Sequence, residues 1–207
     1  MLIHKKIKDW EDNVGAELMK TIGIKDTSIV MDLGCGFAHY AIALKHVIGP
    51  TGKVVAIDSN KRILGLVKNR FLDENIKGIE LKVTPIEALT EEDLKPVDFI
   101  LLYDLLHGNE FNRHEFLGKI RTWIKSDCIV SILPFHFSNF RDREGKKKKY
   151  TLKKIIDEMN ALDYDFVDSF DQVGIHFEKY HSPHIMQKGE LTFEDLEVGT
   201  ILNFKRK

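Results

Sequence analysis

Residues 30–60 read VMDLGCGFAHYAIALKHVIGPTGKVVAIDSN. Residues 29–33 are typical of a buried parallel strand, after which Gly34 and Gly36 let the backbone reverse tightly and approach a ligand. Apolar residues at helical spacing over 40–47 predict a helix whose first amide groups point into the turn. A second turn and a second apolar strand follow, so the stretch predicts two parallel strands joined by a helix.

Asp58 ends the second of these strands. It follows Gly36 by about twenty residues, and this spacing places a carboxylate at the tip of the neighbouring strand, against the hydroxyls of a ribose. The combination of glycine turn and strand-end acid therefore predicts a site for an adenosine-containing molecule.

The turn departs from the common phosphate-binding patterns. A dinucleotide fingerprint, G-x-G-x-x-G, has its third glycine where this chain has His39, whose imidazole would crowd the path of a pyrophosphate. The sequence also lacks the phosphate loop G-x-x-x-x-G-K-[ST]. Asp32 instead places a carboxylate inside D-L-G-C-G, where it would repel phosphate and hold an ammonium group or ordered water. We therefore expect adenosine with a cationic or amino-bearing tail and no nicotinamide dinucleotide.

The motif D-L-G-C-G-x-A, followed by G-K-V-V-A-I-D, resembles the first two motifs of class I S-adenosylmethionine-dependent methyltransferases. The resemblance implies an α/β fold with a doubly wound, mostly parallel, seven-stranded Rossmann-like sheet and an antiparallel terminal strand. It also implies S-adenosyl-L-methionine as cofactor. Asp32 and the turn would hold its methionine end and Asp58 its ribose hydroxyls, with further cofactor-binding positions at Gly34, Cys35, Gly36 and Ser59.

Length and composition agree with one domain. The chain has 207 residues, 43% of them hydrophobic, and its apolar runs are strand-sized, so no membrane span is expected. The charged N-terminus lacks a signal core, and two cysteines do not make a disulfide framework, so we expect a cytoplasmic protein with reduced thiols. The predicted parts are an N-terminal helical lid (1–25), a cofactor-binding half (26–135) and a substrate-side half (136–207).

Strand and helix patterns alternate along the rest of the chain, which predicts a parallel sheet with helices on both faces. An amphipathic helix is expected over 7–22, and its buried face is formed by Ile7, Trp10, Val14, Leu18 and Ile22. A second helix is expected over 61–75, and its inward residues are Ile63, Leu66, Val67 and Phe71. The remaining expected elements are strands at 79–83, 97–103 and 128–133, helices at 113–123 and 152–162, and a terminal hairpin of 165–170, with a possible extension to 177, and 200–205. The hairpin strands resemble antiparallel sixth and seventh strands of the methyltransferase fold.

Ligands of open α/β sheets bind at the carboxyl ends of strands. After the third strand, the family often has an acid near the adenine amino group, but this chain has Pro85 there. The backbone of Ile86 or the side chain of Glu87 is the expected substitute; the alternative is that Glu87 is a solvated loop acid.

After the fourth strand the chain reads Tyr103-Asp104-Leu105-Leu106-His107, which resembles the family's strand end before a leucine-histidine pair. The resemblance implies that Tyr103 or Asp104 lies beside the methionine portion and that His107 faces the substrate. The alternatives are a helix N-cap for Asp104 and a structural role for the histidine. After the fifth strand, His136 between two phenylalanines forms either a substrate wall or a cap over the core.

Two further clusters leave alternatives open. The basic run at 141–154 is usually a solvated segment, and otherwise an attractor of RNA or another anionic substrate. His176, His181 and His184, with Glu178, suggest metal ligands, but their spacing matches no closed zinc pattern and a lining for the acceptor pocket fits at least as well. We assign no metal.

Methyl transfer from a sulfonium needs mainly alignment and exclusion of water. A base is required only where the acceptor must lose a proton, and the candidates are His107, His136 and His176. The sequence predicts a small-molecule acceptor, because no recognition domain or strongly basic face is evident. The alternatives are an RNA or protein methyltransferase that uses 141–154 and a non-catalytic S-adenosylmethionine-binding protein. Trp10 is either part of a lid over the cofactor or a packing residue.

Overall fold

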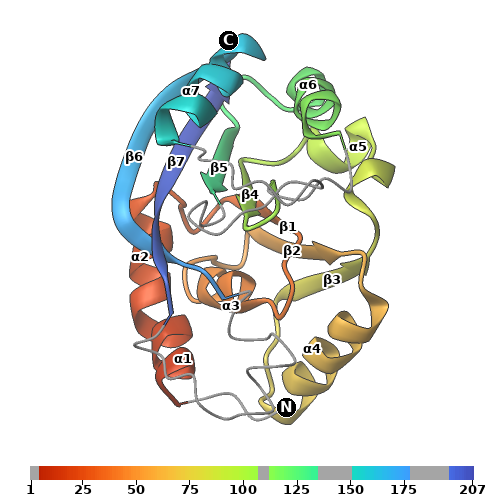
Figure 1. Cartoon of the computed structure of the whole chain (residues 1–207). Coiled ribbons are helices and arrows are strands. Elements are labelled where there is room, and N and C mark those ends of the chain that lie inside the picture. The colour runs from red at the N-terminus through yellow and green to blue at the C-terminus, as the bar shows by residue number, and fades with distance from the viewer. Residues whose placement is uncertain (1–4, 107–111, 135–150, 178–195) are drawn as a thin grey trace, which may run out of the picture.

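The computed structural model describes residues 5–106, 112–134, 151–177 and 196–207. Its centre is one sheet, built from β1 (Ile29–Leu33), β2 (Lys53–Asp58), β3 (Ile79–Val83), β4 (Phe99–Tyr103), β5 (Ile129–Leu133), β6 (Tyr164–Ile175) and β7 (Val198–Arg206). The strand order is β3-β2-β1-β4-β5-β7-β6 (Figure 1). The order reverses between β1 and β4, and this switch point is where open α/β sheets bind ligands.

The first five strands are parallel, and β7 is antiparallel to both of its neighbours, β5 and β6. Since β6 pairs antiparallel with β7, it runs in the same direction as the first five strands. The predicted seven-stranded, mostly parallel sheet with an antiparallel terminal strand is therefore confirmed. The predicted terminal hairpin is also confirmed, because β6 and β7 pair antiparallel with each other.

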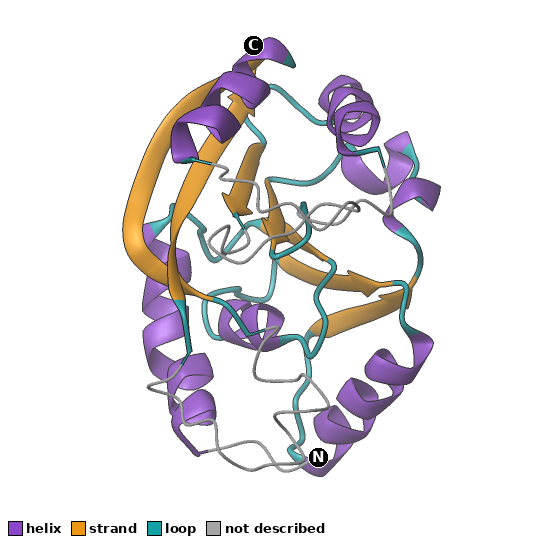
Figure 2. Ribbon diagram, viewed as in Figure 1, coloured by secondary structure: helices purple, strands orange, loops and turns teal. Residues whose placement is uncertain are grey.

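Side chains alternate between the two faces of the sheet and form two hydrophobic clusters. In β4, for example, Leu101 belongs to the cluster under the N-terminal helix, whereas Ile100 and Leu102 belong to the cluster on the other face. Figure 2 shows helices on both sides of the strands. The core is thus a three-layer arrangement in which nearly every central strand residue is buried, as expected for a parallel sheet.

The helices that follow the strands are α3 (His39–Lys45), α4 (Lys61–Asp73), α5 (Glu91–Leu94), α6 (Arg113–Trp123) and α7 (Leu152–Ala161). Side chains of Asn60, Asn112 and Thr151 accept backbone hydrogen bonds at the starts of α4, α6 and α7. The short 3-10 helix η2 (Ile86–Ala88) and α5 were not predicted, because elements of three or four residues carry no periodic pattern.

The inward face of α4 differs from the prediction in one position. Leu64 is buried, whereas Leu66 is 40% exposed. Leu64, Val67 and Phe71 lie three and four residues apart and share a face, and Leu66 falls two residues away from Leu64, on another side of the helix.

The N-terminal helical segment contains a π-helical turn, η1 (Trp10–Val14), between α1 (Lys5–Asp9) and α2 (Gly15–Thr21). Its wider turn closes with the hydrogen bond from Gly15 N–H to the carbonyl of Trp10. As a result Val14, predicted on the buried stripe, is 61% exposed, and Glu11 is fully buried. An uninterrupted α-helix would have kept Val14 on the face of Ile7. The π-turn therefore turns a carboxylate, and not a valine, toward the core.

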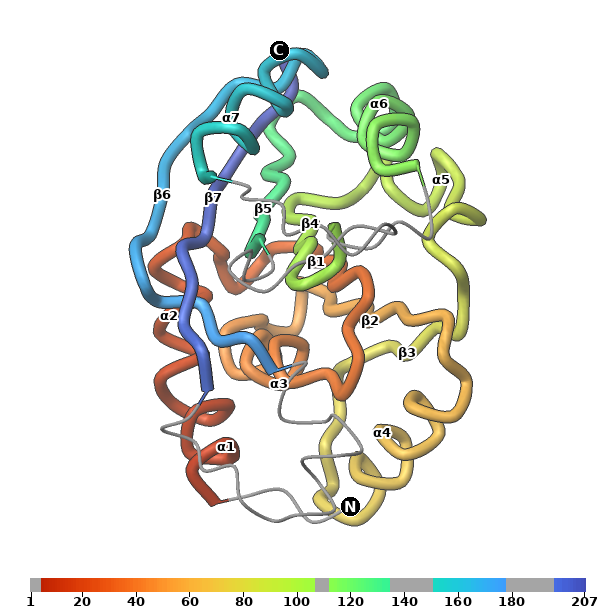
Figure 3. Tube along the Cα trace, in the orientation of Figure 1, coloured from red at the N-terminus to blue at the C-terminus, as the bar shows by residue number. Residues whose placement is uncertain are grey.

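The β6–β7 hairpin runs past the N-terminal helices along one flank of the molecule (Figure 3). The end of β6 is hydrogen-bonded to helix α3: the Tyr40 hydroxyl donates to the carbonyl of Ile175 at 2.9 Å and accepts from the Ile175 N–H at 2.7 Å. This contact joins residues that lie 135 positions apart in the sequence. It brings the end of β6 next to the strand tips.

Candidate active site

Polar groups gather at the carboxyl ends of β1, β2 and β4. Leu33 pairs with Ile57, and Asp32 pairs with Leu101, so β1, β2 and β4 end at about the same level. The glycine turn follows Leu33, Asp58 closes β2, and Asp104 follows β4. These groups come from strands on both sides of the switch point, which makes this edge of the sheet the candidate site.

The glycine turn and the tip of β2 form one hydrogen-bonded unit. Gly34 and Gly36 have φ angles of 72° and 50°, which glycine adopts without the steric cost of a side chain. The N–H of Gly34 donates to the carbonyl of Ile57 at 2.8 Å, and the N–H of Gly36 donates to Asp58 Oδ2 at 2.9 Å. A carboxylate has lone pairs for about four hydrogen bonds, so Asp58 retains capacity for the hydroxyls of a sugar.

Asp32 lies in β1, two residues before the turn, and is 3% exposed. Its Oδ2 has no hydrogen-bond partner within the described part of the chain. Burial raises the pKa of Asp32 to about 7; the nearby Asp58 carboxylate raises it too, and the backbone N–H of Ala41 lowers it. A buried carboxyl oxygen without a partner is energetically costly, so binding of a cation or a hydrogen-bond donor beside it is favourable.

Both cysteines are free, as expected. Cys35 lies within the turn, and burial raises the pKa of its thiol, with further contributions from Asp32 and Asp58. A raised pKa disfavours the thiolate, which is the nucleophilic form of cysteine. Its N–H donates to the carbonyl of Ile57 at 3.0 Å, so Cys35 serves the turn through its backbone.

Asp104, after β4, adopts a left-handed backbone with a φ of 55°. Its carboxylate Oδ1 lies 2.5 Å from Nδ1 of His176, which directly follows β6, and its N–H donates to the carbonyl of Leu133. Residues 104–106 are not helical, so the N-cap alternative for Asp104 is not what the structure shows. A non-glycine residue in this conformation is strained, and such strain gathers at functional sites.

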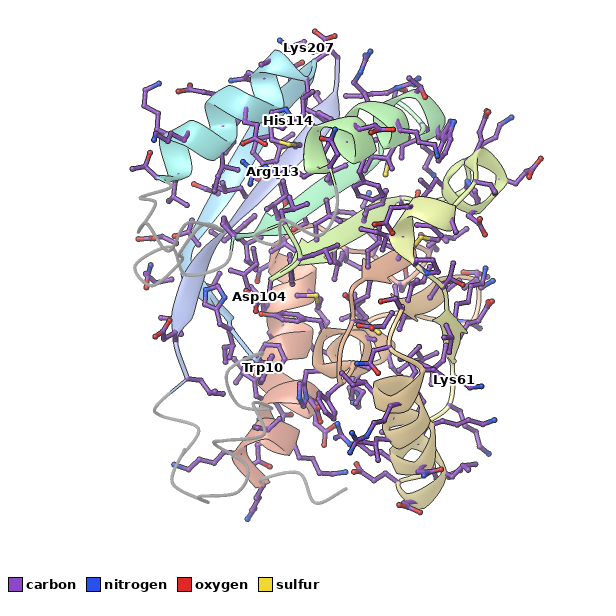
Figure 4. The ribbon with its side chains drawn as sticks, turned by 45° about the vertical axis from the view of Figure 1, so that its right-hand side comes forward. Trp10, Lys61, Asp104, Arg113, His114 and Lys207 are labelled. Carbon is purple, nitrogen blue, oxygen red and sulfur yellow. The ribbon has the colours of Figure 1, made fainter. Side chains whose placement is uncertain are left out.

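Tyr103 points into the core. Its hydroxyl lies 2.9 Å from the Ser131 hydroxyl, and its ring meets that of Tyr40 edge-on, with centroids 4.6 Å apart. Burial raises the pKa of the Tyr103 phenol, while the bond to Ser131 lowers it. Trp10 is buried as well and packs against Tyr40 and Phe177, which is the packing alternative considered for this residue. Figure 4 shows Trp10 and Asp104 on the same flank of the molecule.

The third strand tip lies beside the second, since the N–H of Thr84 donates to the carbonyl of Asp58 at 3.1 Å. Ile86 begins η2 and is buried, and Glu87, in the same turn, is exposed. Ser59 is exposed next to Asp58. The predicted cofactor positions from β1, β2 and β3 thus lie along one edge of the sheet.

A second polar cluster, which the sequence did not reveal, lies behind the turn. Arg70 of α4 donates to both oxygens of Glu11, at 2.8 and 2.5 Å, and Nδ1 of His39 lies 2.5 Å from Glu11 Oε1. Burial opposes the charge on Glu11, but hydrogen bonds from Arg70 and His39 outweigh it and lower its pKa. Burial also lowers the pKa of His39. In the sequence, a glutamate and an arginine on amphipathic helices are expected at the surface, so no sequence pattern predicts this cluster.

A family profile described as a methyltransferase domain matches residues 24–188, well over half of the chain. The chain belongs to the methyltransferase-domain family. With the turn, the acids and the strand order above, this membership confirms the predicted resemblance to the class I S-adenosylmethionine-dependent methyltransferase family.

Solved methyltransferase structures share the fold of this domain. An S-adenosylmethionine-dependent methyltransferase from Aquifex aeolicus matches over 100% of both chains, with a TM-score of 0.67 and 16% identity. Magnesium protoporphyrin IX methyltransferase from Synechocystis, solved with bound S-adenosylmethionine, matches 97% of this chain and 79% of its own, with a TM-score of 0.58 and 14% identity. At such identities the likeness concerns the fold alone.

Curated relatives of this methyltransferase domain match a shorter stretch. A demethylmenaquinone methyltransferase from Halalkalibacterium halodurans is 32% identical over 66 residues, which cover 32% of this chain and 27% of the relative. The chain thus spans about a quarter of the length of that relative.

Some predicted positions of the methyltransferase domain fall outside the described residues. These are His107 and His136, most of the basic run at 141–154, and Glu178, His181 and His184 of the histidine cluster. Among residues 5–106, 112–134, 151–177 and 196–207, no group of three or more metal-ligating side chains occurs and no helix is long and apolar enough to cross a membrane. His176, the described member of the cluster, pairs with Asp104.

Proposed function

We propose that this domain transfers the methyl group of S-adenosylmethionine to a small-molecule acceptor. The observation that carries the cofactor part of the proposal is Asp32, a buried carboxyl with an unpartnered oxygen among the described residues, directly before the glycine turn. A cofactor that carries an ammonium group and no phosphate would supply the missing partner. A dinucleotide would instead bring negative charge toward Asp32 and Asp58.

Each strand tip then has one role in holding the cofactor. Gly34, Cys35 and Gly36 leave room for the methionine portion, and Asp58, with Ser59 beside it, accepts hydrogen bonds from the ribose hydroxyls. At the third tip the backbone of Ile86 or the carboxylate of Glu87 contacts the adenine. Asp104 and the backbone of Tyr103 border the methionine portion from β4.

The small-molecule class of the acceptor is supported by the name of the matching relatives, demethylmenaquinone methyltransferases. Because the match covers about a third of this chain, it supports the class of acceptor and not its identity. The low overall charge of −1 also favours a small acceptor over a nucleic acid. Methyl transfer then requires the protein to align the acceptor in line with the sulfonium and to exclude water.

A general base is needed only for an acceptor that loses a proton, such as a phenol or a protonated amine. Of the candidates His107, His136 and His176, the structure describes His176. Its Nδ1 is paired with Asp104, and the opposite nitrogen lies against Gly199, where a Cβ would clash with it. This arrangement favours a role in fixing Asp104, and His107 and His136 stay predicted bases.

The test is transfer of labelled methyl groups from S-adenosylmethionine to a fractionated extract. We expect the label in the small-molecule fraction. Label in RNA or protein that disappears when Lys146–Lys149 are changed to glutamine would overturn the small-molecule proposal. Binding of S-adenosylhomocysteine without transfer to any fraction would instead indicate a non-catalytic binder. The cytoplasmic location stays a prediction that fractionation of cells would check.

A further inference from the structure

Glu11, Arg70 and His39 bind one another in the interior of the protein, with exposed fractions of 0%, 1% and 3%. The bond between Arg70 and Glu11 is bidentate, and the third guanidinium nitrogen, Nε, donates to Glu74 at 2.9 Å. Lys8 closes the outer end of the cluster by binding Glu74 at 2.6 Å. Glu11 and Arg70 thus neutralise each other, which is what allows these two charges to be buried, while Glu74 and Lys8 extend the cluster to the surface.

The three central residues belong to three separate elements. Glu11 lies in the π-turn of the N-terminal segment, His39 is the first residue of α3, and Arg70 lies in α4. Helix α3 begins three residues after Gly36, and α4 begins three residues after Asp58. One carboxylate therefore connects the N-terminal segment to the two helices that start at the two halves of the candidate cofactor site.

Packing of the N-terminal segment against α3 and α4 does not by itself require buried charged side chains. A buried ion pair contributes little more to stability than apolar side chains of similar volume, but its hydrogen bonds fix direction and distance. The π-turn also contributes to this geometry, because it leaves Val14 exposed and points Glu11 inward. His39 also packs against Phe177, with ring centroids 4.3 Å apart, so the same residue joins the turn to the segment after β6.

We propose that Glu11 is a positioning residue for the cofactor: through His39 it holds the start of α3, three residues after Gly36, and through Arg70 it holds α4, the helix that follows β2, and so it couples docking of the N-terminal segment to cofactor binding. The inference rests on the proposed cofactor site. Coupling of this kind is reciprocal. The cofactor stabilises the docked segment, and a segment released from Glu11 lowers the affinity for the cofactor.

The experiment measures S-adenosylhomocysteine binding by calorimetry and hydrogen exchange of residues 5–21 with and without this ligand. In the natural protein we expect the ligand to slow exchange in this segment. In Glu11→Gln, and in Glu11→Leu combined with Arg70→Met, we expect Kd to rise by roughly 5- to 150-fold. The ligand should then no longer slow exchange there. The double variant replaces the buried ion pair with apolar side chains and is designed to fold.

The matched control is Glu17→Gln, which removes an exposed carboxylate from the same segment. Its Kd and its exchange response should equal those of the natural protein. Folded variants at Glu11 that bind with the natural Kd would overturn the inference and leave the proposed function standing. If the natural protein itself failed to bind S-adenosylhomocysteine, the proposed function would fall, and the inference with it. Should the double variant not fold, Glu11→Gln decides the question alone.

Discussion

Asp32 holds its proton more tightly in the folded protein than in the unfolded chain, because its pKa is raised from 3.8 to about 7. Its contribution to stability is therefore largest below pH 4 and is lost as the pH rises toward 7. At about 1.4 kcal/mol for each pKa unit, the loss is on the order of 4 kcal/mol.

The measurement is urea unfolding of the ligand-free protein at pH 5 and pH 8. Asp32→Asn should remove most of this pH dependence, because its amide does not titrate. An ammonium group beside Asp32 favours the ionised carboxyl, so cofactor binding near pH 6.5 should release protons, seen by calorimetry in two buffers. Equal pH dependence in the natural protein and the variant would contradict the raised pKa.

Substitution by alanine should lower the melting temperature by different amounts at Gly34 and at Gly36. A Cβ at Gly34 would come within 2.7 Å of Leu105 Cδ1, whereas a Cβ at Gly36 meets no described atom within 4 Å. Both positions have a positive φ, which costs alanine about 1–2 kcal/mol. Gly34→Ala should therefore lower the melting temperature more than Gly36→Ala does. Equal losses would mean that Leu105 does not confine the turn.

At the scale of elements, Tyr40 connects α3 to the end of β6. Tyr40→Phe leaves the N–H and C=O of Ile175 without this partner, and we expect a cost of about 1–3 kcal/mol in urea unfolding. Tyr164→Phe is the matched control, since its buried hydroxyl makes one bond, to the carbonyl of Leu117. A smaller loss of unfolding free energy for Tyr40→Phe than for Tyr164→Phe would contradict the proposed contribution of the Tyr40–Ile175 hydrogen bonds to stability.

The π-turn of the N-terminal segment makes a separate prediction. Because Val14 is exposed, Val14→Gln should change the free energy of unfolding by no more than about 0.5 kcal/mol. In an uninterrupted α-helix Val14 would be buried, and the same change would cost several times more. Thermal unfolding of this variant distinguishes the two helix geometries.

For the whole molecule, a ligand that binds the folded state alone stabilises it by about 2.7 kcal/mol at a hundred times its Kd. S-adenosylhomocysteine should therefore raise the melting temperature, and NAD should not. Asp58→Ala should abolish the rise, while Asp127→Ala, an exposed carboxylate before β5, should retain it. A rise in the melting temperature with NAD and none with S-adenosylhomocysteine would contradict the proposed cofactor.

Much of the architecture was predictable because its signals are local. Strands 29–33 and 79–83 and the helix at 113–123 match the structure residue for residue, since periodicity and flanking turns mark their limits. The glycine turn and Asp58 lie within one continuous stretch, so their joint site was also predictable. Direct contact between Gly36 and Asp58 confirms that they form one unit.

Contacts between distant segments were not predictable in this way. The partners Glu11 and Arg70 are 59 positions apart, and Asp104 and His176 are 72 positions apart. Which carboxylate is buried depends on a single π-turn, and the helical period does not reveal that turn. Leu66 was misplaced for a similar reason, because its exposure depends on how α4 rotates against the sheet.

The sequence alone determined the fold class, the glycine turn and the acids at the strand tips, because each depends on residues close together in the chain. The tertiary structure decided that Glu11 is buried against His39 and Arg70, that Tyr40 holds the end of β6, and that His176 faces Asp104. These pairings arise when separate helices and strands pack on one sheet. These hydrogen bonds are strong because both partners are buried and correctly oriented, and that arrangement exists only when the separate segments are packed together.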